Sequence, residues 1–302
     1  MIPDTEAVRR LLSSFLESQA ESAAREWLRS RLAAFQKTDL DRTLYLTFSA
    51  VPRYFSKKPL QLSAADRQKA EDLRPGFRPD RWSIDQTARS WLLLHIPSQP
   101  ETQFVTRLSM LFEHADMREA VALYGSLPIL PWQEPFIDRA AEGVRTNMTV
   151  VFDAIALDNP FPADHLPEDA WNQMVLKAAF MDRPLYRIQG LERRANAKLA
   201  HIISDYAHER WAADRVVSPE LWRPVGPFLN DTLLRDMERL FHESNPMQRE
   251  AAALVCQASD HPKAASLLEA HPALGQGIAA GTLSWDQLAL RWWEAKAQPA
   301  EN

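Results

Sequence analysis

The residues of this chain that could do chemistry together lie on one predicted helix, in the segment "HIISDYAHERWAAD" that begins at His201. His201, Asp205 and His208 follow one another at i, i+4 and i+7, the spacing that places side chains on one helix face. Such a face could offer three ligands to zinc or another divalent ion, with Glu209 near enough to join them. It could instead bind a phosphate or a sugar without a metal. The simplest interpretation is a solvated face with local charge pairs.

The apolar stripe of the same helix separates these residues from the core. When Leu199 is placed at zero and each residue advances by about 100°, the three residues fall on the face opposite the stripe. The stripe consists of Leu199, Ile202, Ile203, Tyr206 and Ala213. Arg210 falls in the middle of it, where a guanidinium must reach out to water or meet a carboxylate. We therefore expect Arg210 to form a structural ion pair, with Glu142 and Asp153 among the possible partners, and the binding of an anionic ligand is the alternative.

A second group of polar candidates lies on a long helix predicted over residues 134–157. Its apolar stripe contains Ile137, Ala140, Val144, Met148, Val151 and Ile155. Arg145 and Asn147 lie on the two shoulders of this stripe, so together with Glu142 they form either a polar pocket or a set of structural hydrogen bonds. Trp132, in "LPWQEP", is predicted to be exposed or to line a pocket. The candidate ligand-binding residues are therefore Arg145, Asn147, Glu142, His208, Arg210 and Trp132.

The elements that must position these side chains are predicted to be helices throughout. The chain has 8 glycines and 21 prolines in 302 residues, a balance that suits helices with sharp ends, because proline fits a first helical turn and breaks an interior. Alternating strand patterns are nearly absent. After a first helix capped by Asp4, periodicity predicts helices over residues 22–35, 41–49, 63–73, 83–95, 101–114, 116–124, 134–157, 168–181, 184–191, 196–214, 230–243, 246–258, 262–270, 272–280 and 284–296.

We predict that these helices form a single all-α domain over residues 1–302. Two segments, "AAFMDRPLYRIQGL" and "VCQASDHPKAASLL", both combine a helix, an Asp-X-Pro turn and another helix. This echo indicates helix pairs stacked in an irregular, HEAT-like α-solenoid, and a globular helical bundle is the alternative. Residues 52–81 are predicted to form an irregular excursion over the surface or a functional loop.

Composition excludes several classes of protein. A net charge of −5 and the lack of a long Lys/Arg cluster argue against nucleic-acid binding. Cys256 is the only cysteine, so we predict no intrachain disulfide and place this residue in the core. No apolar run approaches the roughly 18–20 residues that span a bilayer, and no secretory signal is recognised, so we expect a cytoplasmic protein. Since no common nucleotide-binding, serine-hydrolase or metalloprotease motif occurs, we predict no cofactor.

The block from Arg139 to Phe228, which begins "RAAEGVRTNMTVVFDAIALDNPFPADHLP" and ends "SPELWRPVGPF", resembles the EboA family. The earlier segments "FSAVPRYFSKKPL" and "HADMREAVALYGSLPILP" fit the same pattern. The resemblance implies a metabolite traffic protein. Such proteins are encoded beside a UbiA-type prenyltransferase, a TatD-like hydrolase and proteins that resemble a sugar isomerase, a dehydroquinate synthase and a phosphodiesterase. That company implies a pathway that makes or moves a secondary metabolite. The resemblance implies no catalytic residue and no metal ligand.

Two hypotheses about function follow. The first is a non-catalytic helical scaffold, or a metabolite- or partner-binding protein, in a pathway of secondary-metabolite biosynthesis and export. Its partners would be other proteins of the same gene cluster and a small polar metabolite. The alternative is an enzyme of unrecognised type that acts on a small polar substrate, such as a sugar phosphate or a prenylated sugar alcohol. It would use the polar groups around Arg145, Asn147, His208 and Arg210. We favour the first hypothesis because no catalytic motif is recognised.

Overall fold

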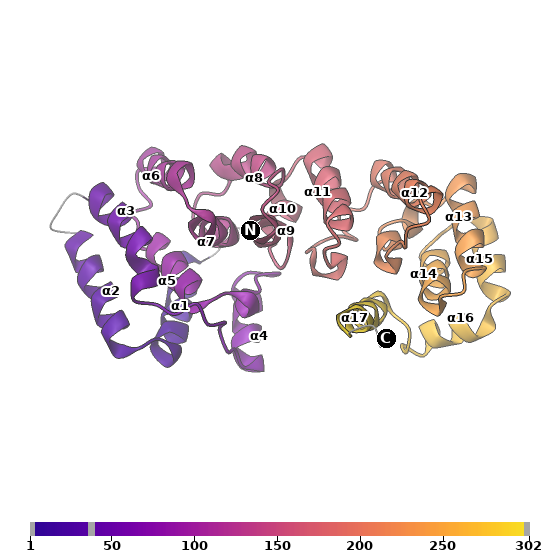
Figure 1. The fold of residues 1–302 in the computed structure, drawn as a ribbon, viewed down its shortest axis with the longest axis horizontal. Helices are drawn as coiled ribbons and strands as arrows, with labels where there is room; N and C mark the ends of the chain where they lie inside the picture. Colours follow the sequence, from indigo (N-terminus) through magenta and orange to yellow (C-terminus); the bar gives the residue numbers. More distant parts are fainter. Residues whose placement is uncertain (1–3, 36–39, 299–302) are drawn as a thin grey trace. The chain divides into compact units, whose positions relative to one another are not determined.

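The structure, a computed structural model, describes residues 4–35 and 40–298. The regular structure of these residues is helical, apart from one isolated β-bridge between Pro59 and Ser83 (Figure 1). The all-α prediction is confirmed. None of the described helices is both long enough and apolar enough to cross a membrane.

The chain folds into two compact units, residues 1–166 and residues 167–302. We call them the N-terminal unit and the C-terminal unit and describe each by itself. The expectation of a single domain stays a prediction, because a compact unit and a folding domain are different properties. The solenoid and its alternative, the globular bundle, stay predictions as well.

The N-terminal unit is organised around one helix, α5, in which every residue is buried. Helices α1 and α7 pack against α5, and α9 packs against α7. The elements of this unit are α1 (Thr5–Gln19), α2 (Ser22–Phe35), α3 (Leu40–Ala50), η1 (Val51–Arg53), α4 (Ala64–Leu73), η2 (Pro79–Arg81), α5 (Ile84–Leu93), α6 (Glu101–His114), α7 (Met117–Ser126), η3 (Leu127–Ile129), η4 (Glu134–Phe136), α8 (Ile137–Gly143), α9 (Thr149–Ala156) and α10 (Phe161–His165).

The polar residues buried on α5 have partners inside the unit. Asp85 and Arg89 form an ion pair one helical turn apart, with Oδ2 and Nη1 separated by 3.3 Å. Arg89 Nε also donates to the carbonyl of Phe48 at 3.2 Å. On the same helix, Ser90 Oγ accepts a hydrogen bond from Ser126 Oγ of α7 at 2.7 Å. These bonds tie α3 and α7 to the central helix, because a buried polar group without a partner is costly.

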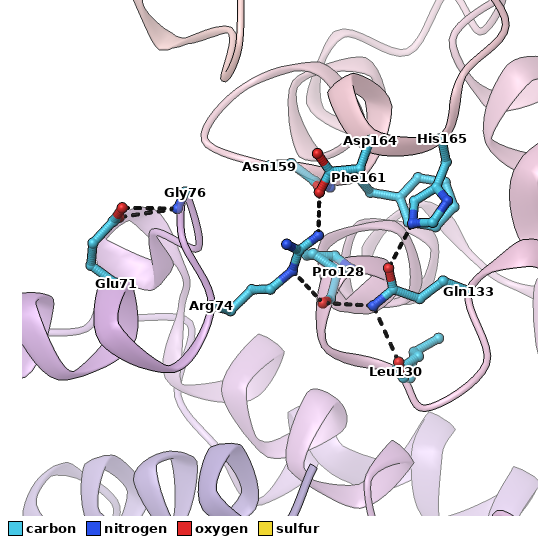
Figure 2. A network of polar contacts seen from close by, with 10 residues as sticks. All are labelled: Glu71, Arg74, Gly76, Pro128, Leu130, Gln133, Asn159, Phe161, Asp164 and His165. Carbon is cyan, nitrogen blue, oxygen red and sulfur yellow. Dashed lines mark hydrogen bonds and ion pairs between the residues drawn. The ribbon is translucent and has the colours of Figure 1, made fainter. Parts of the chain in front are cut away.

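The segment 52–81, predicted as an excursion or a functional loop, packs into the N-terminal unit. Arg74, which follows α4, is 3% exposed. Its Nε donates to the Pro128 carbonyl at 3.1 Å and its Nη2 contacts Asp164 Oδ2 at 2.5 Å (Figure 2). Gln133 Nε2 donates to the same carbonyl at 2.9 Å, and Gln133 Oε1 accepts from His165 Nε2 at 2.8 Å. The segment is therefore fixed by a buried guanidinium that joins three separate stretches of the unit.

The prediction of one long helix over residues 134–157 is wrong. The chain forms η4, α8 and α9, with a turn over residues 144–148 between the two α-helices. Gly143, the last residue of α8, lies so close to the Tyr124 ring that a Cβ atom there would stand 2.6 Å from Tyr124 Cζ. After the turn, α9 packs against α7 with Val151 and Ile155 buried. Tertiary packing on Tyr124 and α7 therefore interrupts a helix that its periodicity alone would continue.

The C-terminal unit is organised around α14, which contacts α13, α15, α16, α17 and two 3-10 helices. Cys256 of α14 is buried, as predicted, and burial raises the pKa of its thiol to about 12. The elements of this unit are α11 (Glu168–Phe180), η5 (Leu185–Arg187), α12 (Ala197–Ala212), η6 (Pro219–Trp222), η7 (Gly226–Phe228), α13 (Asp231–Phe241), α14 (Pro246–Gln257), α15 (Pro262–Glu269), α16 (Pro272–Ala279) and α17 (Trp285–Ala297).

The helix boundaries of this unit follow local capping signals. Asn245 and Ser284 cap α14 and α17 with their side chains. At the start of α15, the side chain of His261 accepts the Lys263 N–H. The helix predicted over 184–191 is reduced to the single 3-10 turn η5.

Two glycines provide a matched test of this packing. Gly143→Ala should lower the free energy of unfolding by about 1–3 kcal/mol, because the new methyl group would overlap a ring held in the core. Gly275→Ala on α16, where the nearest atom would be 3.9 Å away, should raise stability by roughly 0.5–1 kcal/mol through helix propensity. Urea unfolding followed by circular dichroism measures both, and equal effects of the two substitutions would contradict the assignment.

Candidate functional site

A cavity of about 380 Å³ lies in the C-terminal unit and is the candidate functional site. Four stretches of chain form its walls: the end of α11, the second half of α12, the segment 216–221 and the last turns of α17. The charged and aromatic residues of the wall are Phe180, Asp182, Tyr206, Arg210, Trp292 and Lys296. The cavity therefore combines two cations, one carboxylate and aromatic surface.

Helix α12 is positioned by an amide pair at its start. Asn196 caps the helix by accepting the Leu199 N–H at 2.8 Å. The Asn196 and Asn172 side chains also exchange two hydrogen bonds, of 2.9 and 3.2 Å, and Asn172 is 1% exposed. This buried pair fixes α12 against α11. It sets where Tyr206 and Arg210, one helical turn apart, face the cavity.

Arg210 lies in the cavity wall and is held by a backbone carbonyl of its own unit. Its Nε and Nη2 atoms donate to the carbonyl of Val216 at 3.3 and 2.8 Å. The chain turns back after α12 and brings this carbonyl, six residues away, to the guanidinium. Glu142 and Asp153 belong to the N-terminal unit, so the expected pairing of Arg210 with one of them stays a prediction. Arg210 therefore remains available to an anion in the cavity.

The opposite wall is supplied by α17. Trp292 is half-buried, and the ammonium of Lys296 lies 4.8 Å from the Trp293 ring centroid and 5.8 Å from that of Trp292. Lys296 also forms an ion pair with Asp182, which follows α11. Contact between a cation and aromatic rings is attractive, so the Lys296 side chain has a preferred place along this wall.

Two polar atoms of the cavity's lining residues are buried without a hydrogen-bond partner. They are Ser218 Oγ and Trp292 Nε1. Buried polar groups in native proteins nearly always have a partner. Both atoms belong to residues of the cavity wall, but they are themselves buried within that wall.

A buried carboxylate holds α17 in place beside the cavity. Glu220 of η6 is 0% exposed. It accepts hydrogen bonds from the indole of Trp293 and, at 2.6 Å, from the backbone N–H of Tyr186. Burial raises the pKa of Glu220 from its ordinary 4.5 to about 7, against the opposing effect of these two hydrogen bonds and of Arg223 and Lys296. Glu220 thus joins η5, η6 and α17, although no sequence motif marks it.

A second cavity, of about 260 Å³, shares Val216 and Val217 with the first. It is more polar and carries charges of both signs, from Asp214, Arg215, Arg239 and Glu243. Arg239 lies 4.1 Å from the Trp211 ring centroid and 3.7 Å from a carboxylate oxygen of Glu243. Since these charges are balanced, the second cavity indicates no class of ligand.

His201, Asp205 and His208, predicted to share one helix face, have different contacts. His208 Nε2 lies 2.6 Å from Asp236 Oδ1 of α13, and Asp236 also accepts from Ser204 Oγ at 2.6 Å. His201 instead lies 3.5 Å from the Asn230 side chain, and Asp205 is exposed. Within residues 4–35 and 40–298, no group of three or more His, Cys, Asp or Glu side chains could hold a metal ion. We therefore assign His208 to the α12–α13 contact.

The remaining predicted residues belong to the N-terminal unit. Arg145 and Asn147 are exposed in the turn between α8 and α9, and Glu142 is exposed at the end of α8, 3.6 Å from Arg139. The pocket predicted around them rested on a continuous helix, which does not form. Trp132 is half-buried, and its indole donates to the Ser98 carbonyl at 2.8 Å.

Comparison with protein families gives one match. The model of the family described as "Metabolite traffic protein EboA" matches residues 8–226. The match contains Phe180, Asp182, Tyr206 and Arg210 of the cavity wall and does not reach α17. The comparisons with curated proteins and with solved structures found no match.

The role of Glu220 leads to a prediction about pH. An acid whose pKa rises on folding stabilises the fold fully below its unfolded value, here 4.5. That stabilisation is lost as the pH rises through the folded value of about 7. The wild-type free energy of unfolding, relative to that of Glu220→Gln, should therefore fall by roughly 3 kcal/mol between pH 4.5 and pH 8. Gln loses one acceptor at every pH, so that loss cancels in the comparison. Urea titrations across this range measure it, and a constant difference would contradict the assigned role.

Proposed function

Because the chain belongs to the EboA family of metabolite traffic proteins, we propose that it is a non-catalytic metabolite-binding protein. Its binding site is the cavity between α11, α12, segment 216–221 and α17. The observation that carries this proposal is the composition of the wall. Aromatic surface from Phe180, Tyr206 and Trp292 and the two cations Arg210 and Lys296 surround one space.

The size of the cavity favours a small molecule. Pockets for small ligands commonly measure about 300–1,000 Å³ and combine apolar walls with a few polar groups that fix orientation. At about 380 Å³ the cavity lies at the lower end of that range. A protein partner would need a far larger contact area. The site therefore supports metabolite binding more directly than a scaffold role.

The proposal about the pathway rests on the family alone. We propose that the protein works in the cytoplasm, in the biosynthesis and export of a secondary metabolite, together with proteins encoded in the same cluster. In this role it would hold an intermediate between enzymes. In the alternative form of this proposal, the protein is a scaffold that binds those enzymes through a solenoid surface, and the cavity has no role.

The enzyme alternative differs in what happens to the bound molecule. A binding protein returns its ligand unchanged, whereas an enzyme of unrecognised type would convert it. The two are separated by recovering the molecule that copurifies with the protein and incubating it with fresh protein. Mass spectrometry of that molecule before and after incubation would show conversion directly.

The first prediction for this site concerns retention of a ligand. Tagged protein purified from its native cells should retain a small molecule, detected by mass spectrometry after denaturation. Ala179→Trp should reduce that amount at least about tenfold, because an indole at this wall position fills much of the cavity. Ala295→Trp provides the matched control, since Ala295 is exposed on α17 outside the cavity lining.

The outcome distinguishes the forms of the proposal. Copurifying pathway enzymes without any small molecule, unchanged by Ala179→Trp, would favour the scaffold. An equal loss of the small molecule in both tryptophan variants would show that it binds elsewhere.

A further inference from the structure

The cavity wall carries more positive than negative charge, and its one ion pair is exposed to solvent. Arg210 and Lys296 are its two cations, and Asp182 is its one carboxylate. Asp182 and Lys296 form an ion pair, but 59% of the Asp182 side chain and 37% of the Lys296 side chain are exposed. Ion pairs between such exposed side chains contribute little to stability and are readily exchanged. The carboxylate can therefore leave the ammonium at small cost.

Each cation keeps its place without that carboxylate. The Lys296 ammonium lies against the Trp292 and Trp293 rings. Arg210 is fixed by its two hydrogen bonds to the Val216 carbonyl. These bonds use Nε and Nη2 and leave Nη1 without a hydrogen-bond partner in the described part of the chain. The wall therefore presents two positioned cations to anything that replaces Asp182.

The backbone of Asp182 is fixed, while 59% of its side chain is exposed. Its φ angle of 55° lies in the left-handed region, which Asp and Asn tolerate better than most residues. The Asp182 N–H donates to the Ala179 carbonyl at 3.1 Å, and the Arg183 N–H donates to Ala178 at 2.8 Å, which closes the end of α11. Replacing the carboxylate by the amide of Asn should therefore remove the charge and keep this helix end.

The rest of the lining is apolar and partly uncovered. Phe180 is 72% exposed and Val216 is 67% exposed, although both line the cavity. The Trp292 ring and the buried side chains of Val217 and Leu221 continue this surface. Large apolar side chains exposed at a cavity are typical of a site that covers the apolar part of a ligand.

Building on the proposed function, we infer that the cavity selects amphipathic anions: small molecules with one carboxylate, sulfonate or phosphate group and a flat apolar body. The ligand's anionic group takes the place of the Asp182 carboxylate at Lys296 and also reaches Arg210. Its apolar body covers Phe180 and Trp292. Asp182 is thus an internal competitor that occupies the anion position while the cavity is empty.

Two isosteric probes test this inference: 2-naphthalenesulfonate, which is an anion, and 2-naphthalenesulfonamide, which is neutral. Their affinities for the full chain are measured by isothermal titration calorimetry. The sulfonate should bind wild type more tightly than the sulfonamide. Asp182→Asn should raise sulfonate affinity about three- to tenfold and leave sulfonamide affinity unchanged, since it removes only the competing charge. Lys296→Gln should lower sulfonate affinity by a similar factor.

The control variant is Glu294→Gln, which removes an exposed carboxylate of α17 outside the cavity lining. It should leave both affinities within about twofold, because an exposed charge outside the cavity lining is screened by water and salt. Thermal melts of each variant confirm that it is folded, and Ala179→Trp should abolish binding of either probe.

The possible results separate the two proposals. Equal affinities for sulfonate and sulfonamide, or an Asp182→Asn effect no larger than that of Glu294→Gln, would overturn the inference and leave the cavity as a binding site. Binding that survives Ala179→Trp would place the probes elsewhere and overturn it as well. If neither probe binds at millimolar concentration and no small molecule copurifies with the protein, both the inference and the proposed function fail.

Discussion

The C-terminal unit depends on one buried carboxylate. Glu220 is removed from water and satisfied by the Trp293 indole and the Tyr186 N–H. Any arrangement that breaks these hydrogen bonds is strongly disfavoured. A buried acceptor without a partner costs more free energy than a typical hydrogen bond contributes to stability. Those bonds set the position of α17 against η5 and η6. Since α17 carries Trp292 and Lys296, the composition of the cavity wall is a consequence of where Glu220 is buried.

The N-terminal unit uses the same device with the opposite charge. Arg74 is almost fully buried and joins the end of α4 to Pro128 and to Asp164 (Figure 2). Arg89, on the central helix α5, does the same with Asp85 and the Phe48 carbonyl. Such groups add little net stability compared with apolar residues of similar size, but they allow only the arrangement in which they are satisfied. Here Arg74 fixes the connection that follows α4, and Arg89 fixes α5 against α3.

The sequence predicts the helices well because their signals are local. Caps and periodicity lie within one element, and the predicted bounds of α2 and α6 agree with the structure. The interruption at 144–148 depends on the contact between Gly143 and Tyr124, which periodicity does not contain. At the site, the 100° spacing along the helix places Arg210 within the apolar stripe, but it does not identify the Val216 carbonyl as its partner. Lys296 and Asp182 are 114 positions apart, and each looks alone like an ordinary surface charge. The Asp-X-Pro turn marks the chain reversal at Asp182, but it does not indicate that Lys296 lies beside it.

The family match divides the cavity wall into two parts. Arg210, Tyr206, Asp182 and Phe180 lie within the matched residues 8–226, whereas Trp292 and Lys296 on α17 lie beyond them. Under our inference the anion position is built from both parts, because Lys296 holds it and Asp182 competes for it. Selection among anionic metabolites would then be set where α17 meets the end of α11.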